Sequence, residues 1–459
     1  MLGNGFGSPT SRLGRATSGR SRLRPGRLPV VVGAVAVAVA MAATGAASAA
    51  GRPTGTGATT TLRAAPAAAA ATGKTLVIGT DLPLQGASKA ASDETNQAIE
   101  LYLSQIGHQA GPYTIQLRAY DDSTAASARW DAAQCQANAS AHIANTDEVA
   151  VVGPYNSGCA KIMVPILDQD PAGPMLMVSH ANSNPGLTKK WDTGEPGKYY
   201  PRGIRNYARV TTTDEVQGVA AATLAAKRLH VKRMFVLDDN EVYGHGVAAA
   251  FAQAAKKAGV KVVGRGSWSP TAADYRALFR RIKAARADAV YLGGIFDNNG
   301  GQLIKDKVAV LGSNSTVKLI GSDGFTAYPE LDAMRPAQGA YLTFPGLTTD
   351  SLLARGGAAA AFLRAYKAKY GAYPRSSYAL YGVAAVQLVL EAVKHSGGTR
   401  AGVRNAVFSG RGLTVGASTS VLGRAFSIDP RTGDVTLKDI TVEVVRNSKE
   451  QVFTIVSVR

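Results

Sequence analysis

The chain has 459 residues and a formal net charge of +19, a length that is sufficient for two or three domains. Residues 1–73 hold eight arginines and no lysine or acid, so the remaining body carries +11. That charge is spread as single Lys and Arg residues, without the basic helix or interleaved aromatic residues of a nucleic-acid-binding protein.

The first segment has the pattern of an export signal. Its arginines precede an uncharged Val/Ala/Gly run over 28–51 with a small-x-small site at 47–49, which predicts a signal peptide over 1–50. The run is also long enough to remain as a membrane anchor. No lipid-bearing cysteine follows it, and we expect residues 51–73, rich in Ala, Gly and Thr, to form a disordered linker. The prediction is an exported protein at the cell surface.

From Lys74 onward, short apolar runs alternate with helical patterns. In the first half, strands are predicted at 75–80, 114–122 and 149–154, and helices at 94–107 and 127–143. After an irregular stretch at 205–218, which suits a crossing, the pattern restarts with helices at 218–230, 246–259 and 275–285 and strands at 233–239, 260–264, 289–294 and 317–324. A long helix at 377–397 and a final strand at 440–447 follow. Such alternation predicts an α/β fold of two doubly wound lobes.

Two strand-to-loop segments, 149–159 and 175–188, carry the strongest functional signal. Each ends an apolar strand in small residues that bear hydroxyl or amide groups, among them Ser157, Asn182 and Ser183. A strand that leads into a helix directs backbone N–H groups and the positive end of the helix dipole at one place. Neighbouring parallel strands bring such loops together, so we expect a carboxylate site there, whereas either loop alone would suggest only a turn with an N-cap.

Candidates in the second half follow its predicted strands. Asp323 ends the strand at 317–324, where it could bind a cation or form an Asx-turn before Gly324. Tyr243 and Phe296 follow two other strands and could face the same cleft or pack in the core.

The sequence lacks the motifs of common catalytic and metal sites. It contains no Gly-x-Ser-x-Gly, P-loop, Cys-x-x-Cys or His-Glu-x-x-His pattern, and its six histidines are scattered. The segment 244–250 resembles a dinucleotide-binding loop, but its pattern favours the start of a helix. His180 could act as an acid or base, although a place in a pocket wall suits it better. We therefore expect no catalysis, no metal and no cofactor.

Only two cysteines are present, Cys135 and Cys159. An even count in an exported protein indicates one disulfide, and two buried free thiols are the alternative.

From Lys74 to the end, the chain resembles the periplasmic binding proteins that capture leucine, isoleucine and valine for ABC transporters. Eight segments in order carry the resemblance: IGTDLPLQG, AYDDS, VVGPYNSG, SHANSNPGLT, DDNEVYG, YLGGIFD, IGSDG and AFSIDPRTGD. It implies two lobes joined by three crossings, the type I periplasmic binding protein fold, that close on a ligand. The lobes would comprise 74–209 with 344–438 and 210–343 with 439–459.

The resemblance also implies roles for single residues. Ser157 and Ser183 would hold an α-carboxylate, and Asp323, in place of the family's usual Glu, would pair with an α-ammonium. Tyr243 and Phe296 would cover the ligand. Tyr155 and Asn182 would complete the site, and Tyr155 adds bulk near the side-chain pocket.

The predicted function is therefore capture of an amino acid or related small polar solute for an ABC permease by a monomeric, non-enzymatic protein. The alternatives are a ligand-sensing ectodomain held by an uncleaved anchor, and an amide- or urea-binding protein of the same fold. A hydrolase on this fold would need a nucleophile-base pair that the sequence does not offer.

Overall fold

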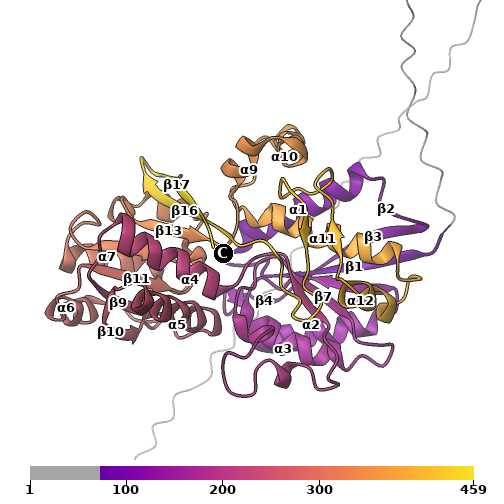
Figure 1. The fold of residues 1–459 in the computed structure, drawn as a ribbon, viewed down its shortest axis with the longest axis horizontal. Helices are drawn as coiled ribbons and strands as arrows, with labels where there is room; N and C mark the ends of the chain where they lie inside the picture. The colour runs from indigo at the N-terminus through magenta and orange to yellow at the C-terminus, as the bar shows by residue number, and fades with distance from the viewer. Residues whose placement is uncertain (1–72, 459) are drawn as a thin grey trace, which may run out of the picture. The chain divides into compact units, whose positions relative to one another are not determined.

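The computed structural model describes residues 73–458 (Figure 1). The predicted signal segment 1–50 and the linker up to residue 72 lie outside the described residues. Within 73–458, two largely parallel sheets carry helices on both faces and form two lobes. The predicted α/β fold with two doubly wound lobes is confirmed. None of the helices built from these residues is long and apolar enough to cross a membrane.

The first lobe is built on a six-stranded sheet. Its order is β2 (Gln109–Ala110), β3 (Tyr113–Asp121), β1 (Thr75–Leu82), β6 (Glu148–Val152), β7 (Leu176–Ser179) and β8 (Tyr207–Arg209). Every pair is parallel except β2 with β3. Its helices are α1 (Lys89–Gln105), α2 (Ala132–Ala144), α3 (Ser157–Asp168), α11 (Tyr378–Lys394) and α12 (Arg400–Phe408).

Alternation of side chains along β6 explains how this sheet is covered on both faces. Ala150 and Val152 belong to the apolar cluster beneath α1 and α11. Val151 points the other way, into a cluster that contains Cys159 and Met163 of α3. Because successive side chains of a strand face opposite sides, an uninterrupted apolar strand requires helices on both sides.

The second lobe is built on a seven-stranded sheet. Its order is β10 (Lys261–Ser267), β9 (Arg233–Asp238), β11 (Ala289–Gly293), β12 (Lys318–Gly321), β13 (Tyr341–Phe344), β16 (Asp439–Arg446) and β17 (Lys449–Ser457). The strands are parallel up to β13, whereas β16 and β17 are antiparallel additions. Its helices are α4 (Asp214–Thr223), α5 (Val242–Lys257), α6 (Arg276–Ala284), α7 (Gly300–Leu311) and the short α8 (Pro329–Ala333).

The chain passes between the two sheets three times: after β8, after β13 and before β16. We propose the lobe limits 74–209 with 344–438 and 210–343 with 439–459, which this strand membership supports. Between β13 and α11 lie α9 (Thr349–Arg355) and α10 (Gly357–Tyr370). The described residues also form two small antiparallel pairs, β4 (Ser123–Thr124) with β5 (Arg129–Trp130) and β14 (Thr414–Val415) with β15 (Phe426–Ser427).

Two predicted segments differ from the structure. The helix expected over 127–143 begins only at Ala132, because the Asp131 carboxylate caps it by accepting hydrogen bonds from the N–H groups of Ala133 and Gln134. The stretch 205–218 is not irregular throughout, since it holds β8 and then the start of α4 at Asp214. Acids in the first turn of α4 suit the positive end of the helix dipole.

Candidate functional site

The first candidate loop follows β6 and ends at the first residue of α3. Gly153 has a φ of +135°, and a Cβ there would overlap the backbone oxygen of Asp81, so the strand can turn into the loop only with glycine. Ser157 opens α3 and is 2% exposed. Its hydroxyl has no hydrogen-bond partner among the described residues. The loop therefore presents a buried, unused hydroxyl beside a helix N-terminus.

The second loop follows β7 and is bonded directly to the first. Ser179 Oγ donates to the Pro154 carbonyl at 3.0 Å, and Asn182 Nδ2 donates to the Pro154 and Tyr155 carbonyls at 3.0 and 2.9 Å. Both amide protons of Asn182 are thus used within the protein. Asn182 therefore joins the two loops, and its predicted contact with a ligand stays a prediction. Ser183 is fully buried, and its hydroxyl forms no hydrogen bond of good geometry.

Asp323 lies at the carboxyl end of β12 and is 6% exposed. Its Oδ1 accepts hydrogen bonds from Gln217 Nε2 at 2.8 Å and the Tyr243 hydroxyl at 2.6 Å, and its Oδ2 accepts one from the Tyr378 hydroxyl at 2.7 Å. All three donors are neutral. Burial raises the pKa of Asp323, and these three hydrogen bonds oppose part of the rise. The carboxylate therefore receives hydrogen bonds from the protein, but no Lys, Arg or His of residues 73–458 forms an ion pair with it.

A second acid lies close to Asp323. Asp214 opens α4 and is fully buried, and its carboxylate lies beside the Ser183 hydroxyl without forming a hydrogen bond of good geometry to any described residue. Its backbone N–H donates to the Ser183 carbonyl at 2.9 Å, which fixes α4 against the second loop. Burial raises the pKa of Asp214 well above its ordinary value; the adjacent Ser183 hydroxyl opposes part of the rise, and the nearby charge of Asp323 adds to it. Two buried acids in one place favour a positively charged ligand group.

Aromatic side chains connect the loops to Asp323. The rings of Tyr155, His180 and Tyr378 meet edge to face, with centroids 5.4 to 5.9 Å apart. His180 is fully buried, and neither ring nitrogen has a partner among residues 73–458. Burial lowers the pKa of His180 to about 3, so the imidazole is neutral at physiological pH. A neutral imidazole can donate one hydrogen bond and accept another, which leaves it available to a ligand.

The structure brings most of the predicted residues together. Tyr243 contacts Asp323 directly, and Tyr155 reaches it through Tyr378. The observed aromatic partners of Phe296 are instead Phe325 at 6.3 Å and Tyr328 at 4.8 Å. Phe296 thus lies in a neighbouring aromatic cluster and makes no ring contact with Tyr243 or Tyr378.

Sequence reasoning missed three residues of this site: Gln217, Asp214 and Tyr378. Gln217 and Asp214 lie in the stretch interpreted as an irregular crossing. The sequence did offer one signal for Asp214, namely an acid at the start of a helix that follows a crossing between lobes. Tyr378 begins a helix that was predicted, but nothing in the sequence separates it from a core tyrosine.

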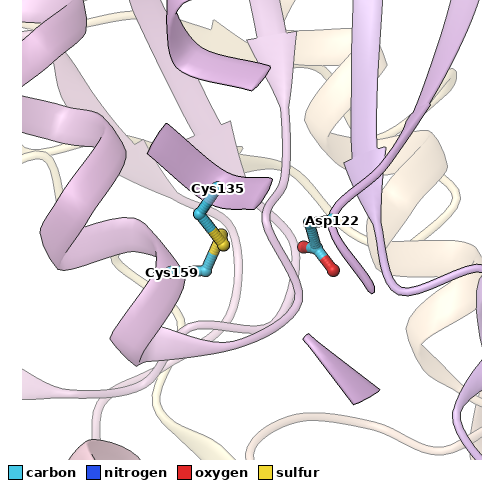
Figure 2. Close-up of side chains that lie close together, drawn as sticks. All are labelled: Asp122, Cys135 and Cys159. Atoms are coloured by element: carbon cyan, nitrogen blue, oxygen red, sulfur yellow. A yellow bond between two sulfur atoms is a disulfide. The ribbon is translucent and has the colours of Figure 1, made fainter. Parts of the chain in front are cut away.

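Cys135 of α2 and Cys159 of α3 form a disulfide, with their Cα atoms 5.6 Å apart (Figure 2). Asp122 lies beside it, and these three residues are the one group of His, Cys, Asp or Glu in the described chain whose potential metal ligands converge. The disulfide occupies both sulfurs, so neither is available as a thiolate ligand. The group is therefore a structural cross-link of the first lobe.

Contacts between the lobes surround this site. Ser88 Oγ donates to Asp297 Oδ2 at 2.6 Å, and Asn184 Nδ2 donates to the Val242 carbonyl at 3.3 Å. Arg129 bonds to Asn298 across the same boundary. In the structure, the two lobes are therefore in contact near the buried polar groups.

Two doubly wound lobes joined by three crossings, with unpaired polar groups buried where they meet, define a two-lobed binding protein. Residues 75–432 match the family described as periplasmic binding protein. The chain belongs to this family.

Relatives and solved structures agree with the assignment. A Leu/Ile/Val-binding protein homolog of Brucella melitensis is 27% identical over 350 residues, which cover 75% of this chain and 86% of the relative. A Leu/Ile/Val-binding protein of Rhizobium johnstonii is 32% identical over 176 residues, or 38% of this chain, and that match spans only 43% of the relative.

The structural likeness concerns the fold alone, because the identities are low. A leucine binding protein of Thermotoga maritima has a TM-score of 0.68 at 20% identity, covering 83% of this chain and 99% of its own. A solute binding protein of Rhodopseudomonas palustris, solved in complex with p-hydroxybenzoic acid, has a TM-score of 0.69 at 18% identity, covering 83% and 97%.

Proposed function

We propose that this protein captures an amino acid, or a closely related small solute with an ammonium group, between its two lobes and delivers it to an ABC-type permease. Family membership supports the binding role, and relatives are named for binding leucine, isoleucine and valine. The charges and hydrogen-bonding groups of the site indicate which chemical groups of the ligand are recognised.

The observation that carries the proposal is the charge of the site. Asp323 accepts three hydrogen bonds from neutral donors, and the Asp214 carboxylate has no cationic partner and no hydrogen bond of good geometry among the described residues. Buried carboxylates are costly unless a cation pairs with them. An ammonium group between the lobes would supply that cation and gain charge-assisted hydrogen bonds.

The two loops of the first lobe offer the complementary half. Ser157 and Ser183 have buried hydroxyls without good hydrogen bonds, and Ser157 lies in the first turn of α3. Hydroxyl donors and free N–H groups at a helix N-terminus favour a carboxylate. A ligand with one ammonium and one carboxylate group would satisfy both halves.

We further propose that the protein is exported by the N-terminal segment, is monomeric, and acts as a binding component without catalysis. The predicted signal, the single disulfide and the family's extracytoplasmic role support this proposal. Detection of a mature N-terminus near Ala50 in secreted protein would support it, whereas an intact N-terminus retained in the membrane would favour the sensing alternative.

A thermal-unfolding screen of the purified protein tests the binding role. The panel should hold L-amino acids, simple neutral amides such as acetamide, urea, benzoate and 4-hydroxybenzoate. A ligand at 100 times its Kd adds about 2.7 kcal/mol to the free energy of unfolding, so one or more amino acids should raise the Tm clearly. Stabilisation by an aromatic acid or a neutral amide alone would contradict the proposal, because neither carries an ammonium group.

A further inference from the structure

A pocket lined by residues of both lobes lies beside the ring of Phe344, which contacts Tyr378. Phe344 lines the pocket, and its ring centroid is 4.8 Å from that of Tyr378, whose hydroxyl bonds to Asp323. The cavity has a volume of about 240 Å³. It is lined by α8, β16 and β17 of one lobe and by α9 and the segment before α11 of the other.

The charged residues that line this pocket are mainly acidic. They comprise four acids and two bases: Asp332, Asp350, Glu443, Glu450, Arg375 and Lys449. Arg375 bonds to Asp332. Lys449 lies 3.8 Å from Asp350, and both of these side chains are more than half exposed, so this pair forms the rim. Two acids, Glu443 and Glu450, have no basic partner within residues 73–458.

Glu443 is the residue that points to a ligand. It lies on β16 between Val442 and Val444, is 7% exposed, and forms no side-chain hydrogen bond or ion pair with any described residue. Glu450 differs, because its Oε1 accepts a hydrogen bond from the Ala327 N–H at 2.8 Å. Burial, with the charges of Asp350 and Asp332, raises the pKa of Glu443 to about 8. A carboxyl group in this position is either protonated or paired with a cation from outside the chain.

The spacing of the acids favours an organic cation over a metal ion. A calcium ion needs about six to eight oxygen ligands within about 2.6 Å. Among the described residues, no three carboxylates of this pocket bring their oxygens within 4.8 Å of one another. An ammonium group directs three donors outward and can pair with acids that are further apart.

We propose that this pocket binds a small organic cation that carries primary ammonium groups, one of which pairs with Glu443. A short aliphatic diamine fits the excess of two acids over bases and the size of the cavity. Since the lining comes from both lobes, the bound cation favours the arrangement in which the lobes are in contact. This site is separate from the amino-acid site and does not depend on it.

Isothermal titration calorimetry of the full chain with 1,4-diaminobutane tests the proposal, with butane-1,4-diol as the neutral isostere. The diamine should bind and the diol should not. Glu443→Gln should weaken diamine binding at least tenfold. Glu100→Gln, at a side chain 46% exposed on α1, should leave it unchanged, and so should Asp323→Asn, which alters the other site.

Four results would overturn the proposal: no diamine binding, equal affinity in Glu443→Gln, loss of binding in Asp323→Asn, or displacement of the diamine by millimolar CaCl₂. If Glu443→Gln fails to fold, two other measurements still test whether the pocket binds the diamine. Asp350→Asn at the exposed rim should weaken binding several-fold, and wild-type titrations at pH 7 in buffers of different ionisation enthalpy should show proton release. Absence of both effects refutes the pocket as a cation site.

Discussion

At the scale of single residues, the site is distinguished by polar groups that the protein buries and leaves unsatisfied. Native proteins pair most buried polar atoms. Here the hydroxyl of Ser157, both nitrogens of His180 and both oxygens of Asp214 lack partners within the described chain. These three groups lie at the boundary between the lobes, where a polar ligand would satisfy them.

Ser157 and Ser183 should contribute separately to affinity. Replacing either with Ala leaves a ligand carboxylate oxygen short of one donor, which typically costs about 1–3 kcal/mol. Titration of each single variant with the ligand found by the thermal screen should show affinity reduced about 5- to 150-fold. Ser140→Ala, at an exposed position of α2, is the matched control. Wild-type affinity in both Ser157→Ala and Ser183→Ala would remove the loops from the site.

His142 should make the stability of the first lobe depend on pH. It is fully buried, with Nε2 2.9 Å from Asp81 Oδ2 and Nδ1 bonded to Glu148. Burial alone lowers its pKa, but the hydrogen bonds with Asp81 and Glu148 outweigh burial and raise it to about 9. Because the folded-state pKa exceeds the unfolded value of about 6.5, the stabilisation is complete below pH 6.5 and is lost as the pH rises through 9.

We therefore expect His142 to contribute about 3 kcal/mol to the free energy of unfolding at pH 6 and little at pH 9.5. Chemical denaturation of wild type and His142→Gln at both pH values measures this difference. His395→Gln, whose side chain is 62% exposed, should behave as wild type does. A gap between wild type and His142→Gln that is the same at both pH values would refute the buried imidazolium.

At the scale of elements, the disulfide holds the helix that presents Ser157. Cys159 lies two residues after Ser157 in the first turns of α3, and its bond to Cys135 fixes α3 against α2. The bond closes a loop with a sequence separation of 24, for which the chain-entropy account predicts about 2–4 kcal/mol.

The Cys135→Ser, Cys159→Ser double variant should lose about that much stability. Wild type that is unfolded and then refolded in the presence of reductant should lose the same free energy of unfolding. Reductant should leave the stability of the double variant unchanged. Mass spectrometry of the unreduced secreted protein should find no alkylatable thiol. Two free thiols in that sample would contradict the structure's cross-link.

The alternating elements could be predicted from sequence because apolar strands such as β6 and β11 are buried on both faces, and periodicity reports burial directly. The start of α2 could not be placed, because a cap at Asp131 overrides a helical pattern that begins earlier. The sequence placed Asp323 and the two serines in the segments that follow predicted strands, and the structure has them there; their contact with a ligand stays a prediction. Gln217 and Tyr378 were not predicted, because their role depends on contacts across 106 and 55 residues of sequence.

At the scale of the whole body of the protein, residues 73–458, both lobes contribute to the surroundings of the buried Asp323 carboxylate. Asp323 belongs to the second lobe, but one of its three hydrogen-bond donors, Tyr378, comes from α11 of the first. Ligand binding and lobe contact are therefore linked, and a ligand shifts the equilibrium by its difference in affinity for the two arrangements.

The central claim is that Asp323 pairs with the ammonium group of an amino acid. Calorimetry should compare the amino acid found by the screen with its analogue that lacks the amino group, using wild type, Asp323→Asn and the exposed control Asp93→Asn on α1. Wild type and Asp93→Asn should bind the amino acid alike. Asp323→Asn should lose about 2–5 kcal/mol of binding free energy, and the analogue should bind wild type weakly. Equal affinity of Asp323→Asn for the amino acid, or equal affinity of wild type for the analogue, would contradict the account.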